Sequence, residues 1–211
     1  MINFSKYDNI IFDFDGVIID SNFIKEKCIS QASKNYAQKD YHNNFIEYFT
    51  KNNGIPRELK IAKFFSKDEA KQIQIDYENC LFQYLNNLEL TAGLVDFLYL
   101  LKFHNIKPYI LSGAPTNEIY SILKIKKIDT YFVEIFGGPR TKEANLQKFA
   151  KIEKTLFIGD SQIDYEVADK FKFDFIFMYG YTQFDTWKEF FKDKKILMSI
   201  KDFSTLTNYN C

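Results

Sequence analysis

The chain has 211 residues, of which 46% are hydrophobic and 18% aromatic, so it can bury a substantial core and is not disordered as a whole. Basic and acidic residues number 28 each, and this balance gives no electrostatic reason to expect nucleic acid or an anionic membrane as a partner. No apolar run approaches the roughly 20 residues of a membrane-spanning helix, and the first residues lack a signal-peptide core, so we expect a cytoplasmic protein.

The three cysteines, Cys28, Cys80 and Cys211, are far apart in the sequence and form no Cys-x-x-Cys pair. This pattern indicates neither a zinc site nor a disulfide framework. We therefore expect reduced thiols, as in most cytosolic proteins.

The predicted elements begin with a buried strand at residues 9–14, which runs into the polar turn Asp13-Phe14-Asp15-Gly16. Residues 21–90 then carry helical patterns. The clearest begins at Ser66, which forms a capping box with Glu69 ahead of apolar residues at helical spacing.

From residue 91 onward, predicted helices and strands alternate. We expect helices at 94–103, 116–123, 142–150, 164–171 and 187–191, and strands at 108–111, 131–136, 155–158, 175–178 and 195–197. Such alternation is typical of α/β proteins with a doubly wound parallel sheet. The sequence therefore predicts a Rossmann-like core, formed by residues 1–20 and 91–211, with a small helical cap at residues 21–90.

Polar side chains stand where these strands end, and open parallel sheets bind ligands beyond the carboxyl ends of their strands. In chain order the polar residues are Asp13, Asp15, Ser112, Lys142, Asp160 and Asp164. Each alone has an ordinary explanation as a turn, helix-cap or surface residue. Their succession at one strand end after another favours a shared site.

Four motifs carry a resemblance to a known family. They are Asp13-Phe14-Asp15-Gly16-Val17, Leu111-Ser112-Gly113, Gly138-Pro139-Arg140-Thr141-Lys142 and Gly159-Asp160-Ser161-Gln162-Ile163-Asp164. In this order they resemble the motifs of the haloacid dehalogenase-like (HAD) hydrolase superfamily. The helical insert after the first motif is similar to the cap of its phosphoglycolate phosphatase-like and β-phosphoglucomutase-like members. Asp15 argues against the dehalogenase and phosphonate-cleaving branches, which lack this second aspartate.

The resemblance implies a role for each polar residue. Asp13 would attack the phosphate of a phosphate monoester and form an aspartyl phosphate. Asp15 would protonate the leaving alcohol and then deprotonate the attacking water. Ser112, Gly113 and Lys142 would bind phosphoryl oxygens.

A Mg²⁺ cofactor is also implied, because the repulsion between a carboxylate and a phosphate must be overcome. Its expected protein ligands are the carboxylates of Asp13 and Asp160 and the backbone carbonyl of Asp15. Gly16 would allow the sharp turn beside the phosphate, and Asp164 would support the site through water or through Lys142.

Arg57 lies in Gly54-Ile55-Pro56-Arg57, which resembles the substrate-specificity loop in the cap of β-phosphoglucomutase-like members. There it would contact a distal anionic group of the substrate. The alternative is an exposed arginine in the first turn of a helix.

The leading functional expectation is a Mg²⁺-dependent phosphatase, a phosphoric monoester hydrolase that acts on a small phosphorylated metabolite. A sugar-phosphate mutase on the same scaffold is the second possibility. A non-catalytic binding protein is the third, and the intact set of Asp13, Asp15, Lys142 and Asp160 speaks against it. We expect no nucleic-acid or membrane partner. The sequence leaves open whether the protein is a monomer or a homodimer.

Overall fold

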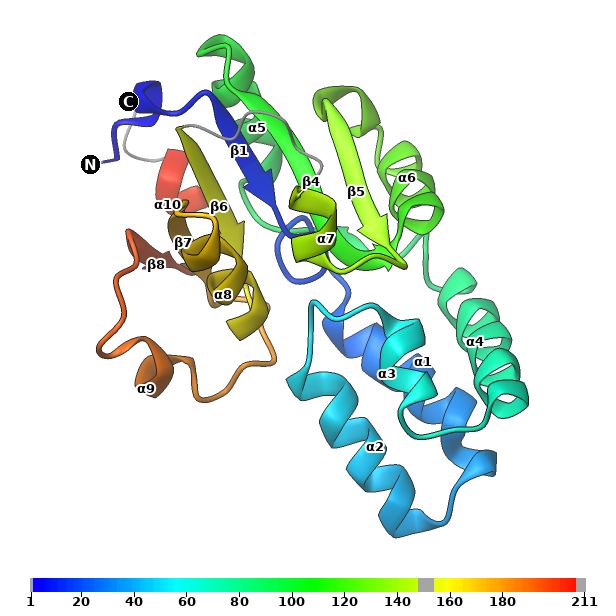
Figure 1. Ribbon diagram of the computed structural model, residues 1–211. Helices are drawn as coiled ribbons and strands as arrows, with labels where there is room; N and C mark the ends of the chain where they lie inside the picture. Colours follow the sequence, from blue (N-terminus) through cyan, green and yellow to red (C-terminus); the bar gives the residue numbers. More distant parts are fainter. Residues whose placement is uncertain (1, 148–153, 208–211) are drawn as a thin grey trace.

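The computed structural model describes residues 2–147 and 154–207 as a six-stranded parallel sheet with a helical cap at one end (Figure 1). In sheet order the strands are β5 (Glu134–Gly138), β4 (Lys107–Pro115), β1 (Asn9–Phe12), β6 (Thr155–Gly159), β7 (Asp174–Met178) and β8 (Met198–Ile200). Every neighbouring pair is parallel. The predicted doubly wound α/β fold is therefore confirmed, and β1 lies in the middle, between β4 and β6.

Both faces of the sheet are buried, which explains why its strands are continuous apolar runs. Ile10 and Phe12 of β1 point into one hydrophobic cluster, and Ile11 between them points into the other. The first face is covered by α5 (Leu94–Phe103), α6 (Thr116–Ile125) and α10 (Ser204–Thr207). The second is covered by α7 (Lys142–Leu146), α8 (Gln162–Lys170) and α9 (Trp187–Phe191).

The cap is formed by four helices, α1 (Asn22–Ser33), α2 (Lys39–Lys51), α3 (Arg57–Ala62) and α4 (Lys67–Phe82). They enclose a hydrophobic cluster of their own, in which Phe45, Ile73 and Tyr77 are almost fully buried. The predicted capping box of Ser66 and Glu69 begins α4. Two short antiparallel strands, β2 (Ile19–Asp20) and β3 (Glu89–Leu90), connect the cap to the core. The arrowheads of β1 and β5 point toward the cap in Figure 1.

Several predicted boundaries are wrong. The last cap helix ends at Phe82, and β3 follows before the core resumes. The strand expected at 131–136 begins at Glu134, because residues Asp129–Tyr131 form a 3₁₀ turn, from which the Tyr131 side chain also packs on the core. The strand expected at 195–197 is β8, at Met198–Ile200. Part of the helix expected at 142–150 lies outside the described residues. No helix in the described ranges has the length and apolar character needed to cross a membrane.

The expectation of reduced thiols is wrong for two of the three cysteines. Cys28 of α1 and Cys80 of α4 form a disulfide, with an S–S distance of 2.13 Å and a Cα–Cα distance of 5.5 Å. The packing of α1 against α4 brings together residues that are 52 positions apart, and spacing in the sequence gives no sign of this contact. Cys211 lies outside the described residues.

Candidate active site

Asp13 lies directly after β1, at the carboxyl edge of the sheet, where its backbone N–H donates to the carbonyl of Ile158 in β6. The Nζ of Lys142 is 2.6 Å from Oδ1 of Asp13 and 2.5 Å from Oδ1 of Asp164. The other oxygen of Asp164 accepts hydrogen bonds from the backbone and hydroxyl of Ser161, within the capping box of α8. The fold thus brings Asp13, Lys142 and Asp164 together, and Asp164 contacts the lysine directly.

Three buried carboxylates form a cluster at this edge. Asp13, Asp160 and Asp164 each offer an oxygen, and these atoms lie within 4.8 Å of one another. Oδ1 of Asp160 is buried and, among the described residues, has no hydrogen-bond partner. Oxygen ligands with an unused lone pair suit a hard divalent cation such as Mg²⁺. The residues present therefore fit a metal site.

The electrostatics of the cluster support the same conclusion. Burial and, to a lesser extent, the negative charge of Asp164 together raise the pKa of Asp13 to about 7, although Lys142 opposes the shift. Burial, together with the negative charge of Asp13, also raises the pKa of Asp160 well above its ordinary value. One lysine does not offset three buried carboxylates, so an additional cation would stabilise their ionised forms.

Gly16 allows the chain to pass close to the acidic cluster. Its φ is +76°, and a Cβ at this position would lie 2.2 Å from Oδ2 of Asp160 and 2.5 Å from Nδ2 of Asn22. Asn22 itself donates to Oδ2 of Asp160 over 3.0 Å and to the backbone carbonyl of Tyr181 over 2.9 Å. The sequence analysis missed Asn22, because a polar residue at the start of a helix is common and carries no motif.

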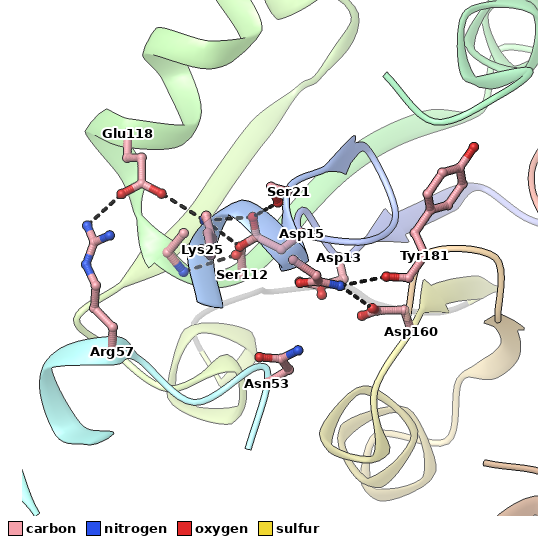
Figure 2. A network of polar contacts seen from close by, with 12 residues as sticks. Asp13, Asp15, Ser21, Lys25, Asn53, Arg57, Ser112, Glu118, Asp160 and Tyr181 are labelled. Carbon is pink, nitrogen blue, oxygen red and sulfur yellow. Dashed lines mark hydrogen bonds and ion pairs between the residues drawn. The ribbon is translucent and has the colours of Figure 1, made fainter. Parts of the chain in front are cut away.

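Asp15 stands beside the cluster with its carboxylate held from the cap side (Figure 2). The hydroxyl of Ser21 donates to Oδ1 over 2.5 Å, and Nζ of Lys25 lies 2.6 and 2.7 Å from the two carboxylate oxygens. Lys25 is also 2.8 Å from Oε1 of Glu118 in α6. These contacts were not predicted from the sequence, since a serine before a helix, or a lysine or glutamate near its start, is an ordinary surface residue in most helices.

Ser112 and Gly113 lie in β4, next to β1, the strand that Asp13 follows. Ser112 is buried, and its hydroxyl oxygen accepts the N–H of Ala114 over 3.1 Å. A Cβ on Gly113 would lie 2.9 Å from the backbone oxygen of Gly54, so the cap loop packs closely on the core at this point. The small size of Gly113 thus permits the cap to approach the strand end.

Arg57 is buried rather than exposed, so the alternative of a solvent-facing arginine is wrong. Its Nη2 lies 2.6 Å from Oε2 of Glu118, and its guanidinium lies over the ring of Tyr77 at 4.5 Å. Arg57 therefore already has an anionic partner within the protein, where the sequence analysis expected a substrate group.

Lys60 is a second buried cation of the cap that the sequence analysis missed. Its Nζ donates to the carbonyl oxygen of Phe49 over 3.0 Å and lies 3.6 Å from the centre of the Phe49 ring. In the part of the chain that the structure describes, it makes no ion pair with a carboxylate. Burial lowers the pKa of Lys60 to about 7.

A cavity of about 50 Å³ lies between cap and core, with space for only a few water molecules. Core residues that line it include Asp13, Asp15, Ser112 and Gly113, and cap residues that line it include Lys25, Arg57 and Lys60. The predicted nucleophile, the predicted acid–base residue and the cationic cap side chains therefore face one compact space.

Comparisons with known proteins agree with this arrangement. The model of the haloacid dehalogenase-like hydrolases matches residues 7–171, a range that contains all four motifs. No curated protein matches the chain.

Three solved structures share the fold at low sequence identity. A predicted phosphatase from Clostridium acetobutylicum is 20% identical with a TM-score of 0.77, over 96% of this chain and 97% of that one. A predicted phosphoglycolate phosphatase from Haemophilus somnus 129PT is 19% identical with a TM-score of 0.74, over 98% and 99%. CbbY from Rhodobacter sphaeroides, in complex with phosphate, is 13% identical with a TM-score of 0.73, over 95% and 96%. Since the family model spans most of the sequence, the chain belongs to the haloacid dehalogenase-like hydrolases.

Proposed function

We propose that this hydrolase is a Mg²⁺-dependent phosphatase that releases inorganic phosphate from a small phosphorylated metabolite. The observation that carries the proposal is the Asp13 carboxylate at the cavity, fixed by a buried ammonium 2.6 Å away. Attack by this carboxylate on phosphorus forms an aspartyl phosphate and releases the alcohol, and water then hydrolyses the acyl phosphate. The proposed groups that stabilise the phosphoryl oxygens are Lys142, the Ser112 hydroxyl and the Gly113 N–H.

Asp15 is the proposed general acid and base. It protonates the leaving alcohol in the first step and takes a proton from the attacking water in the second. Its contacts with Ser21 and Lys25 hold the carboxylate beside the cavity that Asp13 also lines. Both aspartates can therefore meet the same phosphate ester.

The carboxylates of Asp13 and Asp160 and the backbone carbonyl of Asp15 are the proposed Mg²⁺ ligands. When bound, Mg²⁺ offsets the repulsion between the nucleophile and the phosphate. The buried, unpaired Oδ1 of Asp160 supports this assignment. Asp164 has its oxygens engaged by Lys142 and Ser161, so its proposed role is to hold the lysine.

The cap side of the cavity favours a substrate with a second anionic group. Lys25 and Arg57 are neutralised by Asp15 and Glu118, whereas Lys60 faces the cavity without a carboxylate partner in the described residues. The similar Haemophilus somnus protein is a predicted phosphoglycolate phosphatase, and phosphoglycolate carries a carboxylate besides its phosphate. We propose that Lys60, in place of Arg57, meets such a group.

The mutase alternative depended on Arg57 reaching a distal phosphate. Because Arg57 is already bound to Glu118, this reason for preferring a mutase is weakened. The two activities are separated by measuring phosphate release against phosphate migration in the presence of a bisphosphate primer.

The proposal is tested with a generic aryl phosphate in the presence of Mg²⁺. We expect phosphate release that Asp13→Asn abolishes, since the amide is a poor nucleophile. Asp8→Asn is the matched control, because Asp8 is exposed one residue before β1 and should leave activity unchanged. Full activity in a folded Asp13→Asn variant would remove the nucleophile from the mechanism.

A further inference from the structure

Glu118 of the core binds two cationic side chains of the cap. It lies in the first turn of α6, and its Oε1 is 2.8 Å from Nζ of Lys25 while its Oε2 is 2.6 Å from Nη2 of Arg57 (Figure 2). The three side chains are only 10%, 11% and 7% exposed. Each oxygen of one core carboxylate therefore takes one cation from a different cap helix.

The contacts continue from Glu118 to the catalytic centre. Lys25 also lies 2.6 Å from Asp15, so Asp15, Lys25, Glu118 and Arg57 form a continuous network of alternating charges. Burial alone would raise the pKa of Glu118, but the charges of Lys25 and Arg57 outweigh it and lower that pKa. Glu118 is thus ionised at neutral pH and lies between two cationic side chains.

We propose that Glu118 is a positioning residue that holds the cap closed and, through Lys25, fixes the orientation of Asp15. Lys25 and Arg57 come from α1 and α3, and they meet at one core carboxylate only when both helices lie against the core. Movement of the cap away from the core would separate Glu118 from Arg57 and leave Lys25 with fewer carboxylate contacts. Closure and the placement of the acid–base group are therefore coupled.

Stabilisation of the helix N-terminus does not explain Glu118. Asp96 occupies the equivalent third position of α5, where an acidic residue interacts favourably with the helix dipole, and it is exposed. The side chain of Glu118 is only 10% exposed, and both its oxygens are bound by cap side chains. This difference points to a role at the contact between cap and core.

The proposal is tested by hydrogen–deuterium exchange without substrate, on the complete protein and on the variants Glu118→Gln and Asp96→Asn. We expect Glu118→Gln to accelerate exchange roughly tenfold or more in the cap loop at residues 52–60, because a buried ion-pair network is broken. Exchange in β1 and β6 should stay unchanged, and Asp96→Asn should match the unmodified protein. Equal exchange in the two variants would overturn the proposal.

A second variant approaches the same contact from the cap. Arg57→Gln should accelerate exchange in the same segment, and the double variant with Glu118→Gln should add little, since both substitutions remove one interaction. If the effects of the two substitutions on exchange were fully additive, Glu118 and Arg57 would not act through one shared interaction. If Glu118→Gln does not fold, Arg57→Gln alone tests the proposal. Unchanged hydrogen–deuterium exchange at residues 52–60 in that variant would contradict it.

The kinetic consequence rests on the proposed phosphatase function. Glu118→Gln should raise KM and lower kcat about tenfold, a fraction of the about 10²–10⁴-fold contribution of general acid–base catalysis. Glu118→Asp should bring both KM and kcat part of the way back to their original values, because aspartate keeps the negative charge. A KM and kcat that stay unchanged while exchange accelerates would refute the coupling to Asp15. Inactivity of the unmodified protein toward all phosphate esters would instead refute the proposed function, since the exchange measurement needs no substrate.

Discussion

The ammonium nitrogen of Lys142 lies 2.6 Å from a carboxylate oxygen of Asp13, although 129 positions separate the two residues in the chain. Asp13 follows the central strand, and Lys142 begins α7 after the edge strand β5. Parallel strands place both residues at the same end of the sheet. Both side chains are almost completely buried, so the contact is shielded from water.

Removal of this lysine should damage both activity and stability. We expect Lys142→Met to lower kcat/KM by about 10²–10³-fold, as for other preorganised groups that stabilise a shifting charge. The buried carboxylates of Asp13 and Asp164 would lose their cationic partner, so the metal-free protein should also melt at a lower temperature. Lys170→Met is the control, because Lys170 is exposed and should tolerate the change. A melting temperature and rate close to those of the control would contradict the proposed role of Lys142.

Stability without metal should depend on pH in a specific direction. The pKa of Asp13 is raised from an ordinary 3.8 to about 7, so between these values the folded state holds a proton that the unfolded state has lost. Stability of the metal-free protein should therefore fall as pH rises from about 4 to about 7 and then level off. Because Mg²⁺ competes with that proton, the increase in melting temperature on adding Mg²⁺ should be larger at pH 8 than at pH 5.5. Equal increases at both pH values, or the same increase in Asp160→Asn, would argue against the metal site.

Asp15→Ala should separate acid–base chemistry from metal binding. We expect kcat to fall by about 10²–10⁴-fold, while the Mg²⁺ concentration needed for half-maximal activity changes little, because only the backbone carbonyl of Asp15 is a proposed ligand. Asp160→Asn is the comparison, and it should mainly raise the Mg²⁺ requirement. If Asp15→Ala instead behaves like Asp160→Asn, with normal turnover in saturating Mg²⁺, Asp15 is not the acid–base residue.

Lys60 should discriminate between substrates with and without a second negative charge. We expect Lys60→Met to raise KM for phosphoglycolate by about tenfold, the equivalent of one ion pair, and to leave KM for ethyl phosphate unchanged. The exposed Lys63, which lies in the same cap segment, provides the control Lys63→Met. A KM that rises equally for both substrates would assign Lys60 to cap stability alone.

The pH dependence gives a second check on Lys60. Because the pKa of Lys60 is lowered to about 7, the charged form is present below that pH and lost above it. The preference for phosphoglycolate over ethyl phosphate should therefore weaken between pH 6 and pH 8.5 in the unmodified protein and be absent in Lys60→Met. Asp15, Lys25, Arg57 and Glu58 are the charged groups that influence Lys60, and none of them is altered in this comparison. A preference that persists to high pH would indicate another recognition element.

Strand ends were predictable from the sequence because a short apolar run followed by a polar turn reflects local geometry. Asp13 and Asp160 each directly follow such a strand, and the rule that parallel strands share one binding edge is enough to bring them together. The end expected at Ser112 is wrong, because β4 continues through an irregular stretch to Pro115. Lys142 and Asp164 followed from the family resemblance. The capping box at Ser66 was predictable for the same reason, because it involves only Ser66 and Glu69, which are close in the sequence.

The cap contacts were not predictable in the same way. Glu118 of the core and Lys25 of the cap meet where the cap lies against the core, and no spacing in the sequence encodes that contact. Lys60 becomes unusual only through its burial beside Phe49. The burial of Arg57 against Glu118 likewise depends on the angle at which the cap meets the core.

Ile19 of β2 pairs with Leu90 of β3, so the chain leaves the core and returns to it at neighbouring positions. The helical cap is thus inserted into the core between two neighbouring positions, as a long loop would be. The entropic cost of closing such a loop grows only slowly with its length. A different cap domain inserted between β2 and β3 should therefore leave β1 able to fold. The inserted domain would need cationic side chains opposite Glu118, because this carboxylate binds Lys25 and Arg57 of the present cap. Any replacement cap must therefore be matched to Glu118.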